Sequence, residues 1–182
     1  MDVGRQKGFT LIELIFAMGI GILLIALTAS SMQAFMLNNR QVSSINEFIA
    51  SIQYARSEAV TRNNRITICA SVDGINCAAA TWEGGWLIFN DLDGDQVVDA
   101  GEIILRAVGQ VDGMQIRSGV FGNFFVYRPN GRVMTNVVNV NTGQFTFCDR
   151  RGPEKARVII IDVSGRPRGS DKQADGNNPV CV

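Results

Sequence analysis

The sequence contains no histidine, and this absence removes a large part of enzyme chemistry. Histidine is the commonest general base near neutral pH and a frequent zinc ligand, so its absence argues against hydrolytic and metal-assisted catalysis. Charge is no guide to a partner, because 17 Lys and Arg residues balance 17 Asp and Glu residues. The sequence also places no candidate nucleophile beside a base. We therefore expect a protein that is not an enzyme and that needs no catalytic cofactor.

The 4 cysteines include no Cys-x-x-Cys spacing, which argues against a zinc or thioredoxin-like redox site. Two disulfides are the better interpretation, and they would place this part of the chain in an oxidising compartment such as the periplasm. Three pairings are open. The short Asp-Gly-Ile-Asn turn favours Cys69 with Cys77, which leaves Cys148 with Cys181 to tie down a polar C-terminal tail. The alternative is a set of buried, reduced thiols.

What the chain does have is one long apolar run. Every residue from Leu14 to Leu27 is apolar or glycine, and only weakly polar residues dilute the run up to Met36. About 20 such residues span a bilayer as a helix, and the basic residues before the run predict a cytoplasmic N-terminus. A secretory signal peptide cut near residues 26–30 is the alternative, but the helical pattern runs straight through that stretch. We expect residues 9–36 to be the membrane-spanning half of a helix.

Residues 37–63 have a different pattern, with apolar side chains at three- and four-residue steps and polar residues between them. No proline or glycine interrupts residues 22–64, so one continuous helix is expected. Its second half has an apolar stripe that must pack on a globular partner. The stripe consists of Leu37, Val42, Ile45, Phe48, Ile49, Ile52, Ala55 and Val60.

Glu13 stands out because it places a carboxylate at the start of the apolar run. An unpaired carboxylate inside a membrane costs about 2.5 to 3.5 kcal/mol on insertion scales. One interpretation is that Glu13 lies near the membrane surface and extends its side chain to water. The other is that cleavage after Gly8 creates an amino group on Phe9, which pairs with Glu13 of a neighbouring helix. Such a pair would set the relative position of adjacent helices.

The motif Gly8-Phe9-Thr10-Leu11-Ile12-Glu13 follows a short basic leader and precedes an apolar helix. It resembles the class III signal of type IV pilins and type II secretion pseudopilins. The resemblance implies that prepilin peptidase removes a leader of residues 1–8 by cutting between Gly8 and Phe9. It also implies N-methylation of Phe9 and a role for Glu13 in guiding insertion into a growing filament.

Residues 64–182 turn to short runs rich in β-branched and aromatic residues, separated by glycine-containing turns. No second long helix is predicted in this part. We expect an α+β fold in which the N-terminal helix packs on a C-terminal antiparallel β-domain that ends in a polar tail. The expected strands are residues 65–70, 85–90, 103–108, 114–117, 124–128, 144–148 and 157–163.

Several short sequence motifs in this part are similar to motifs of the GspH/FimT family of minor pilins and pseudopilins. The similarity implies a type IV pilin-like fold and a low-abundance subunit near the filament tip that helps to prime assembly. Trp82 and Trp86, which belong to one of these motifs, are interpreted as packing residues rather than ligand contacts. The motifs are residues 54–60, residues 65–69, Trp82 with residues 84–89, and residues 128–132.

The acidic stretch 91–102 matches the spacing of an EF-hand calcium loop, with acidic residues at positions 1, 3, 5, 9 and 12. Against this, Gln96 stands where the loop needs glycine, and both flanks are predicted to be strands rather than helices. A solvated hairpin turn is therefore the alternative to a calcium site. The candidate calcium ligands are Asp91, Asp93, Asp95, Asp99 and Glu102.

The C-terminal part concentrates basic residues, and a flexible Gly/Pro segment there presents two arginines that could bind phosphates. Acidic residues interspersed among them make a solvated tail the alternative. The motif Gly165-Arg166-Pro167-Arg168 is similar to the tail associated with DNA capture in FimT-type members that serve natural transformation. Similar motifs also occur at the C-terminal ends of members that only assemble fibres. The candidate DNA-binding residues are Arg166, Arg168, Arg150, Arg151 and Lys155.

Together these features predict a minor pilin of a type IV pilus-like filament. Its expected partners are other major and minor pilins, prepilin peptidase, the inner membrane and double-stranded DNA. We expect a single pass through the inner membrane, with the globular domain in the periplasm and later in a pilus or pseudopilus at the cell surface. The alternative function is that of the minor pseudopilin H of a type II secretion system.

Overall fold

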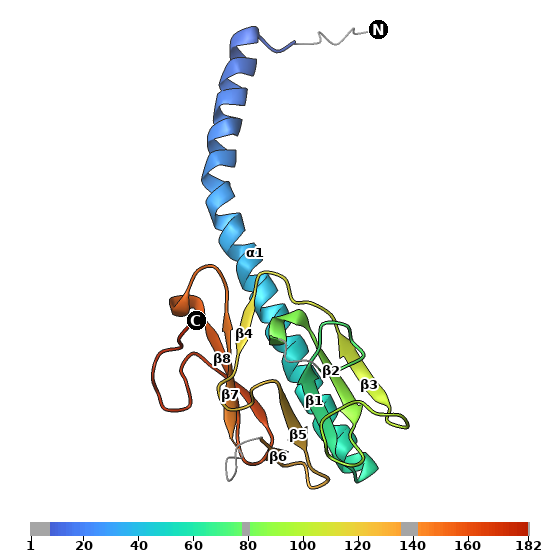
Figure 1. Ribbon diagram of the computed structural model, residues 1–182. Coiled ribbons are helices and arrows are strands. Elements are labelled where there is room, and N and C mark those ends of the chain that lie inside the picture. Colours follow the sequence, from blue (N-terminus) through green and yellow to red (C-terminus); the bar gives the residue numbers. More distant parts are fainter. Residues whose placement is uncertain (1–7, 78–80, 136–141, 182) are drawn as a thin grey trace, which may run out of the picture. The chain divides into compact units, whose positions relative to one another are not determined.

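A computed structural model describes residues 8–77, 81–135 and 142–181 of the chain, without the side chains of 26–31 (Figure 1). Two compact units, residues 1–40 and 41–182, divide the chain, and each is described by itself. The expected leader, residues 1–8, lies outside the described residues except for Gly8.

One helix, α1 (Leu11–Arg62), accounts for almost the whole predicted helical region. At its start the Thr10 hydroxyl accepts a hydrogen bond from the Glu13 backbone N–H at 3.3 Å, as a helix-capping residue does. At its end Asn63 adopts a left-handed conformation with a φ of 51°, and the Asn64 N–H returns to the Ala59 carbonyl. Asparagine is one of the few residues that tolerate this conformation, which explains why the helix ends there.

In the N-terminal unit, large apolar side chains point away from the helix axis on all sides. Phe9 is 83% exposed and Leu11 is 79% exposed. Within the described part of the chain, no helix combines the length and the apolar character needed to cross a membrane.

The globular unit contains two antiparallel sheets that face a common core (Figure 1). Sheet A has the strand order β3-β2-β1-β5-β6, and its middle strand β1 pairs Ile68 with Ile88 on one side and with Phe125 on the other. Its strands are β1 (Ile66–Ala70), β2 (Trp86–Asn90), β3 (Ile104–Val108), β5 (Phe124–Tyr127) and β6 (Val133–Met134).

Sheet B has the strand order β4-β7-β8-β9, so β9 lies at its edge. Two 3-10 turns, Trp82–Gly84 and Pro153–Lys155, complete the regular structure. The expected α+β fold is confirmed, and each expected strand is present within a few residues of its predicted bounds. Strands β6 and β9 were not predicted. The strands of sheet B are β4 (Gln115–Arg117), β7 (Gly143–Cys148), β8 (Arg157–Ile161) and β9 (Pro167–Ser170).

Phe48 on α1 joins the two sheets through aromatic contacts. Its ring lies 4.9 Å from Trp86 of sheet A and 4.7 Å from Phe145 of sheet B, both edge to face. Such pairs contribute about 0.5 to 1.5 kcal/mol beyond the area that they bury. Trp82 and Trp86 are both buried, which confirms their interpretation as packing residues. The Trp82 indole donates to the Gly122 carbonyl at 2.6 Å, so its polar atom is satisfied.

Both disulfides form in the pairing that the short turn favoured. Cys69 at the end of β1 joins Cys77, and Cys148 at the end of β7 joins Cys181. The described residues include no free cysteine. The first bridge closes the loop that follows β1, and the second holds the C-terminal segment against sheet B.

Candidate functional site

The residues expected to direct processing and assembly lie at the start of the described chain. Gly8 has no atom near the position of a Cβ, and the side chains of Phe9 and Glu13 are exposed. A peptidase and a neighbouring helix could both reach these groups. Cleavage at Gly8, methylation of Phe9 and pairing of Glu13 stay predictions.

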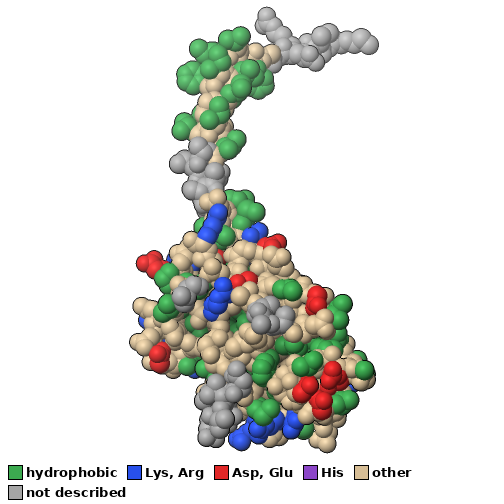
Figure 2. Space-filling model, in the orientation of Figure 1, with side chains coloured by type: hydrophobic (Ala, Val, Ile, Leu, Met, Phe, Trp, Pro, Cys, Tyr) green, Lys and Arg blue, Asp and Glu red, His purple; other side chains and the backbone are tan. Residues whose placement is uncertain are grey.

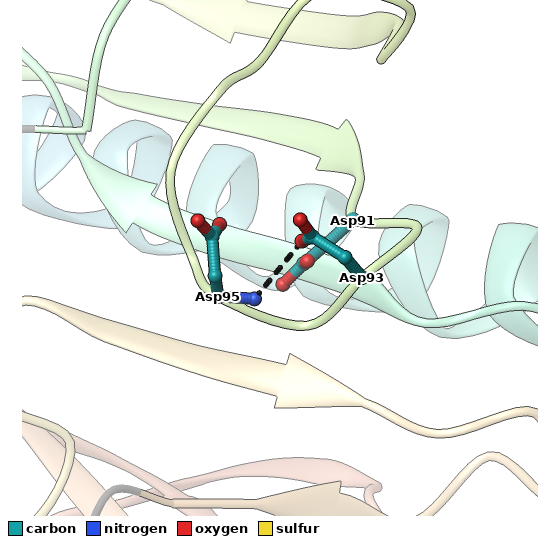
Figure 3. Close-up of side chains that lie close together, drawn as sticks. All are labelled: Asp91, Asp93 and Asp95. Atoms are coloured by element: carbon teal, nitrogen blue, oxygen red, sulfur yellow. Dashed lines mark hydrogen bonds between the residues drawn. The ribbon is translucent and has the colours of Figure 1, made fainter.

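The acidic loop after β2 brings three of its five candidate calcium ligands together. Carboxylate oxygens of Asp91, Asp93 and Asp95 lie within 4.8 Å of one another (Figure 3). Asp91 is fully buried, and its two oxygens accept hydrogen bonds from the Thr67 hydroxyl at 2.6 Å and the Gly94 N–H at 2.7 Å. Asp91 therefore has a structural role whether or not an ion binds.

The other two candidates serve the loop itself. Glu102 accepts hydrogen bonds from the Leu92 N–H at 2.7 Å and the Asp99 N–H at 3.1 Å, which closes the base of the loop. Neither Glu102 nor Asp99 belongs to the three-carboxylate group. Gln96 adopts a φ of 65°, the conformation for which an EF-hand uses glycine. The loop thus reproduces part of an EF-hand with a strained residue at its turn, and calcium binding stays a prediction.

The basic C-terminal segment is a strand and not a flexible tail, so that part of the expectation is wrong. Residues Pro167–Ser170 form β9, which pairs with β8 so that Arg168 lies opposite Ile160 and Pro167 opposite Ile161. Proline is tolerated there because β9 is an edge strand and Pro167 begins it. Arg166 directly precedes β9 and Arg168 lies within it, and both side chains are exposed on this hairpin.

The other basic candidates lie in a different environment. Arg151 binds the Asp149 carboxylate through Nε at 2.9 Å and Nη2 at 2.6 Å, and also approaches Gln41 of α1. The Lys155 carbonyl accepts a hydrogen bond from the same Gln41 at 2.9 Å. Arg150 is exposed. Arg151 thus holds its loop to the helix, and its part in DNA binding stays a prediction with little geometric support.

The ion pair with Arg151 changes the pKa of Asp149. Burial raises the pKa of its carboxyl group, but hydrogen bonds and charge from Arg151 outweigh that effect and hold the pKa below its ordinary value. The folded loop therefore favours the ionised carboxylate.

Gly165, just before the exposed arginines, makes contacts that the sequence did not reveal. Its carbonyl accepts a hydrogen bond from the buried Tyr127 hydroxyl at 2.8 Å, and burial raises the pKa of that hydroxyl. A Cβ on Gly165 would lie 2.3 Å from the Gly131 carbonyl oxygen. That oxygen in turn accepts a hydrogen bond from Arg56 Nε at 3.0 Å. Turns distant in sequence are therefore locked together beside the end of α1.

A groove of about 640 Å³ opens at this junction, between the last turns of α1 and the start of β9. Arg56 and Arg166 both line it, together with Val60 and Pro167. Arg56 is the functional candidate that sequence reasoning missed, because it occupies an ordinary polar position between apolar residues of the helix. The remaining lining residues are Gln53, Ser57 and Thr61.

Two family models match the chain. The model described as Type II transport protein GspH matches residues 44–165, more than half of the chain. The model described as Prokaryotic N-terminal methylation motif matches residues 4–29, which include Gly8, Phe9 and Glu13. No curated protein matches the sequence.

Solved structures with a similar fold include two crystal forms of the type IV minor pilin FimU from Pseudomonas aeruginosa. One is 25% identical with a TM-score of 0.58, and the match covers 75% of this chain and 92% of that one. The other is 24% identical with a TM-score of 0.55, and covers 70% and 90% respectively. The minor pseudopilin EpsH of the Vibrio cholerae type 2 secretion system is also similar, at 10% identity and a TM-score of 0.49, covering 72% and 96%.

Proposed function

The chain belongs to the GspH family, and from this premise we propose that it is a minor pilin of a type IV pilus-like filament. Minor pilins and pseudopilins are structural subunits that assemble with others of their kind. The observation that carries the proposal is the methylation motif over residues 4–29, within which α1 exposes a run of large apolar residues. Such a surface needs a membrane or neighbouring helices to cover it.

The choice of a pilus over a secretion fibre rests on the likeness to FimU, whose title calls it a type IV minor pilin. In the proposed life cycle the chain is anchored in the inner membrane with its globular unit in the periplasm. Prepilin peptidase cuts after Gly8, and Phe9 is methylated. The subunit then joins major and minor pilins through residues 9–36.

Replacing Glu13 with valine tests the assembly step. Cleavage after Gly8 should be normal in the Glu13→Val protein, because that bond precedes the substitution. Incorporation into sheared filaments should fall at least about tenfold if losing the charge pair costs about 1.4 kcal/mol or more, as expected for a charge in a membrane. Glu47→Gln, an exposed carboxylate on the same helix, serves as the matched control. Normal incorporation of Glu13→Val would contradict the pairing.

The alternative, a pseudopilin of a type II secretion system, predicts a different phenotype. Deleting the gene should then reduce the amount of secreted proteins and leave surface pili unchanged. A pilus subunit gives the opposite result, with fewer pili by electron microscopy and normal secretion.

DNA capture is a second function that a specific observation favours. Arg166 and Arg168 are exposed on a hairpin whose backbone is held by the pairing of β9 with β8, so little backbone conformational entropy is lost when they bind phosphates. We expect the full-length protein in detergent to bind double-stranded DNA with an affinity that falls steeply with salt. An Arg166→Ala/Arg168→Ala variant should lose this binding, and Arg106→Ala, at an arginine paired with Glu47, should retain it. Absence of binding at low salt would leave an assembly subunit alone.

A further inference from the structure

Three separate segments of the chain bring arginines together in the globular unit. Hydrogen bonds join the segments, from Arg56 Nε to the Gly131 carbonyl at 3.0 Å and from the Tyr127 hydroxyl to the Gly165 carbonyl at 2.8 Å. Figure 2 shows basic side chains gathered at the lower end of the view. We name as the arginine surface Arg56 on α1, Arg128 and Arg132 on the turn between β5 and β6, and Arg166 and Arg168 on the β8–β9 hairpin.

Among the described residues, no member of the arginine surface takes part in the ion pairs that hold other arginines of the globular unit. Asp162, on the turn between β8 and β9, is an acidic group beside this surface: hydrogen bonds from Ser164 and from the Arg166 backbone, and last the charge of Arg168, hold the pKa of its carboxyl group below the ordinary value. The paired arginines are Arg62, Arg106, Arg117, Arg151 and Arg157.

The backbone that presents these arginines is fixed by its contacts. Gly131 and Gly165 both have a positive φ, and each is followed directly by an arginine of the surface. The space between the two turns has no room for even one Cβ, which would lie 2.3 Å from the Gly131 oxygen. A residue on one turn therefore keeps its position relative to the other turn. The groove between them and α1 is lined by Arg56 on one wall and Arg166 on the other.

We propose that the arginine surface as a whole, and not the β8–β9 hairpin alone, binds the phosphodiester backbone of duplex DNA. This inference rests on the proposed DNA capture and names Arg56 and Arg132 as additional phosphate contacts. Guanidinium groups suit this ligand because their planar donors match two phosphate oxygens at once. In the ranges that the structure describes, none of these guanidiniums is held in an ion pair, and Asp162 offsets part of their combined positive charge. Contacts to phosphates carry no sequence information, so we expect the binding to be independent of sequence.

The test measures the affinity of full-length protein in detergent for a fluorescent DNA duplex across a salt series. Arg132→Gln and Arg56→Gln should each lower the affinity about eightfold at 0.1 M salt, and each should reduce the slope of log K against log salt by about 0.9. Arg106→Gln is the matched control and should change neither. Because Arg56 also holds Gly131, Arg56→Lys and the melting temperature of each variant separate loss of charge from loss of folding. Exposed Arg132 carries the test independently.

The outcomes separate the inference from the proposal on which it rests. If the wild-type protein binds no duplex, DNA capture and the arginine surface both fail. If Arg166→Ala/Arg168→Ala abolishes binding while Arg132→Gln and a folded Arg56→Gln both match the wild type, the hairpin acts alone and the inference is overturned. If sodium poly-L-glutamate displaces the duplex at equal charge concentration, the surface binds acidic peptides equally well and the assignment to phosphodiesters is overturned.

Discussion

Gly165 is the residue on which the geometry of the arginine surface depends most. Its φ of 74° and the 2.3 Å approach to the Gly131 oxygen both exclude a side chain. Gly165→Ala should lower the free energy of unfolding by more than about 2 kcal/mol, because strain at a positive φ adds to a steric clash. Chemical denaturation measures this. Gly169→Ala on the same hairpin, with nothing within 4 Å of its Cβ, should have little effect, and equal losses would contradict the explanation.

Asp149 should give stability a pH dependence at the acid end. Its pKa lies below the ordinary 3.8 in the folded chain, so its ion pair with Arg151 is fully present above about pH 4 and is lost as the pH falls through the folded pKa. Asp149→Asn should cost about 2 kcal/mol at pH 7, since it leaves Arg151 largely buried without its partner.

The difference in unfolding free energy between wild type and Asp149→Asn should narrow as the pH is lowered below about 4. Asp171→Asn provides the control, because Asp171 is 76% exposed in its pair with Arg157 and such pairs contribute little. A difference that stays constant down to pH 2 would mean that the carboxylate charge is not what stabilises the loop.

At the scale of one element, the loop of residues 91–102 makes a prediction about calcium. If Asp91, Asp93 and Asp95 bind the ion with a Kd on the order of 10⁻⁴ M, 1 mM calcium should stabilise the fold by about 1.4 kcal/mol. The melting temperature of the full-length protein should then rise by about 3 to 5 °C. The Asp95→Asn variant should show a smaller rise. No shift at millimolar calcium would identify the loop as a plain turn closed by Glu102.

Strands show where sequence reasoning was sufficient. Runs such as Ile66–Ala70 and Arg157–Ile161 are buried and rich in β-branched residues, and both were predicted within a few residues. Strand β9 was not, because Pro167–Ser170 has no β-branched or aromatic residue and is held only by pairing with β8. Strand β6 is too short to show a period. Hydrogen bonds to a neighbouring strand stabilise these two segments in place of strand propensity. The sequence of one segment does not show which strand it will pair with.

The candidate site divides in the same way. Arg166 and Arg168 were identified from a short contiguous motif, as were the acidic residues of the 91–102 loop. The contact of Arg56 with Gly131 joins residues that are 75 positions apart in the sequence, and no local sequence pattern predicts it. Distant contacts of this kind depend on the register of both sheets, which the sequence pattern leaves open.

At the scale of the whole molecule, the globular unit should fold without the N-terminal one. Every buried member of the main core lies between Phe48 and Ile161, within residues 41–182. A protein of residues 41–182 should therefore melt cooperatively, within about 2 °C of the transition that full-length protein shows in detergent. Circular dichroism at a strand wavelength provides the measurement. A broad transition would show that residues 1–40 contribute to the core.

The Cys148–Cys181 bridge has a consequence for resistance to proteolysis. It closes a covalent loop that contains the whole β8–β9 hairpin, including the exposed Arg168. A protease that cuts the chain once after Arg168 would leave both fragments joined through the bridge and through the pairing of β8 with β9. Such a nicked subunit would keep its mass on a non-reducing gel and split only on reduction. A subunit exposed to such a protease would thus lose chain continuity at this hairpin before it lost the hairpin itself.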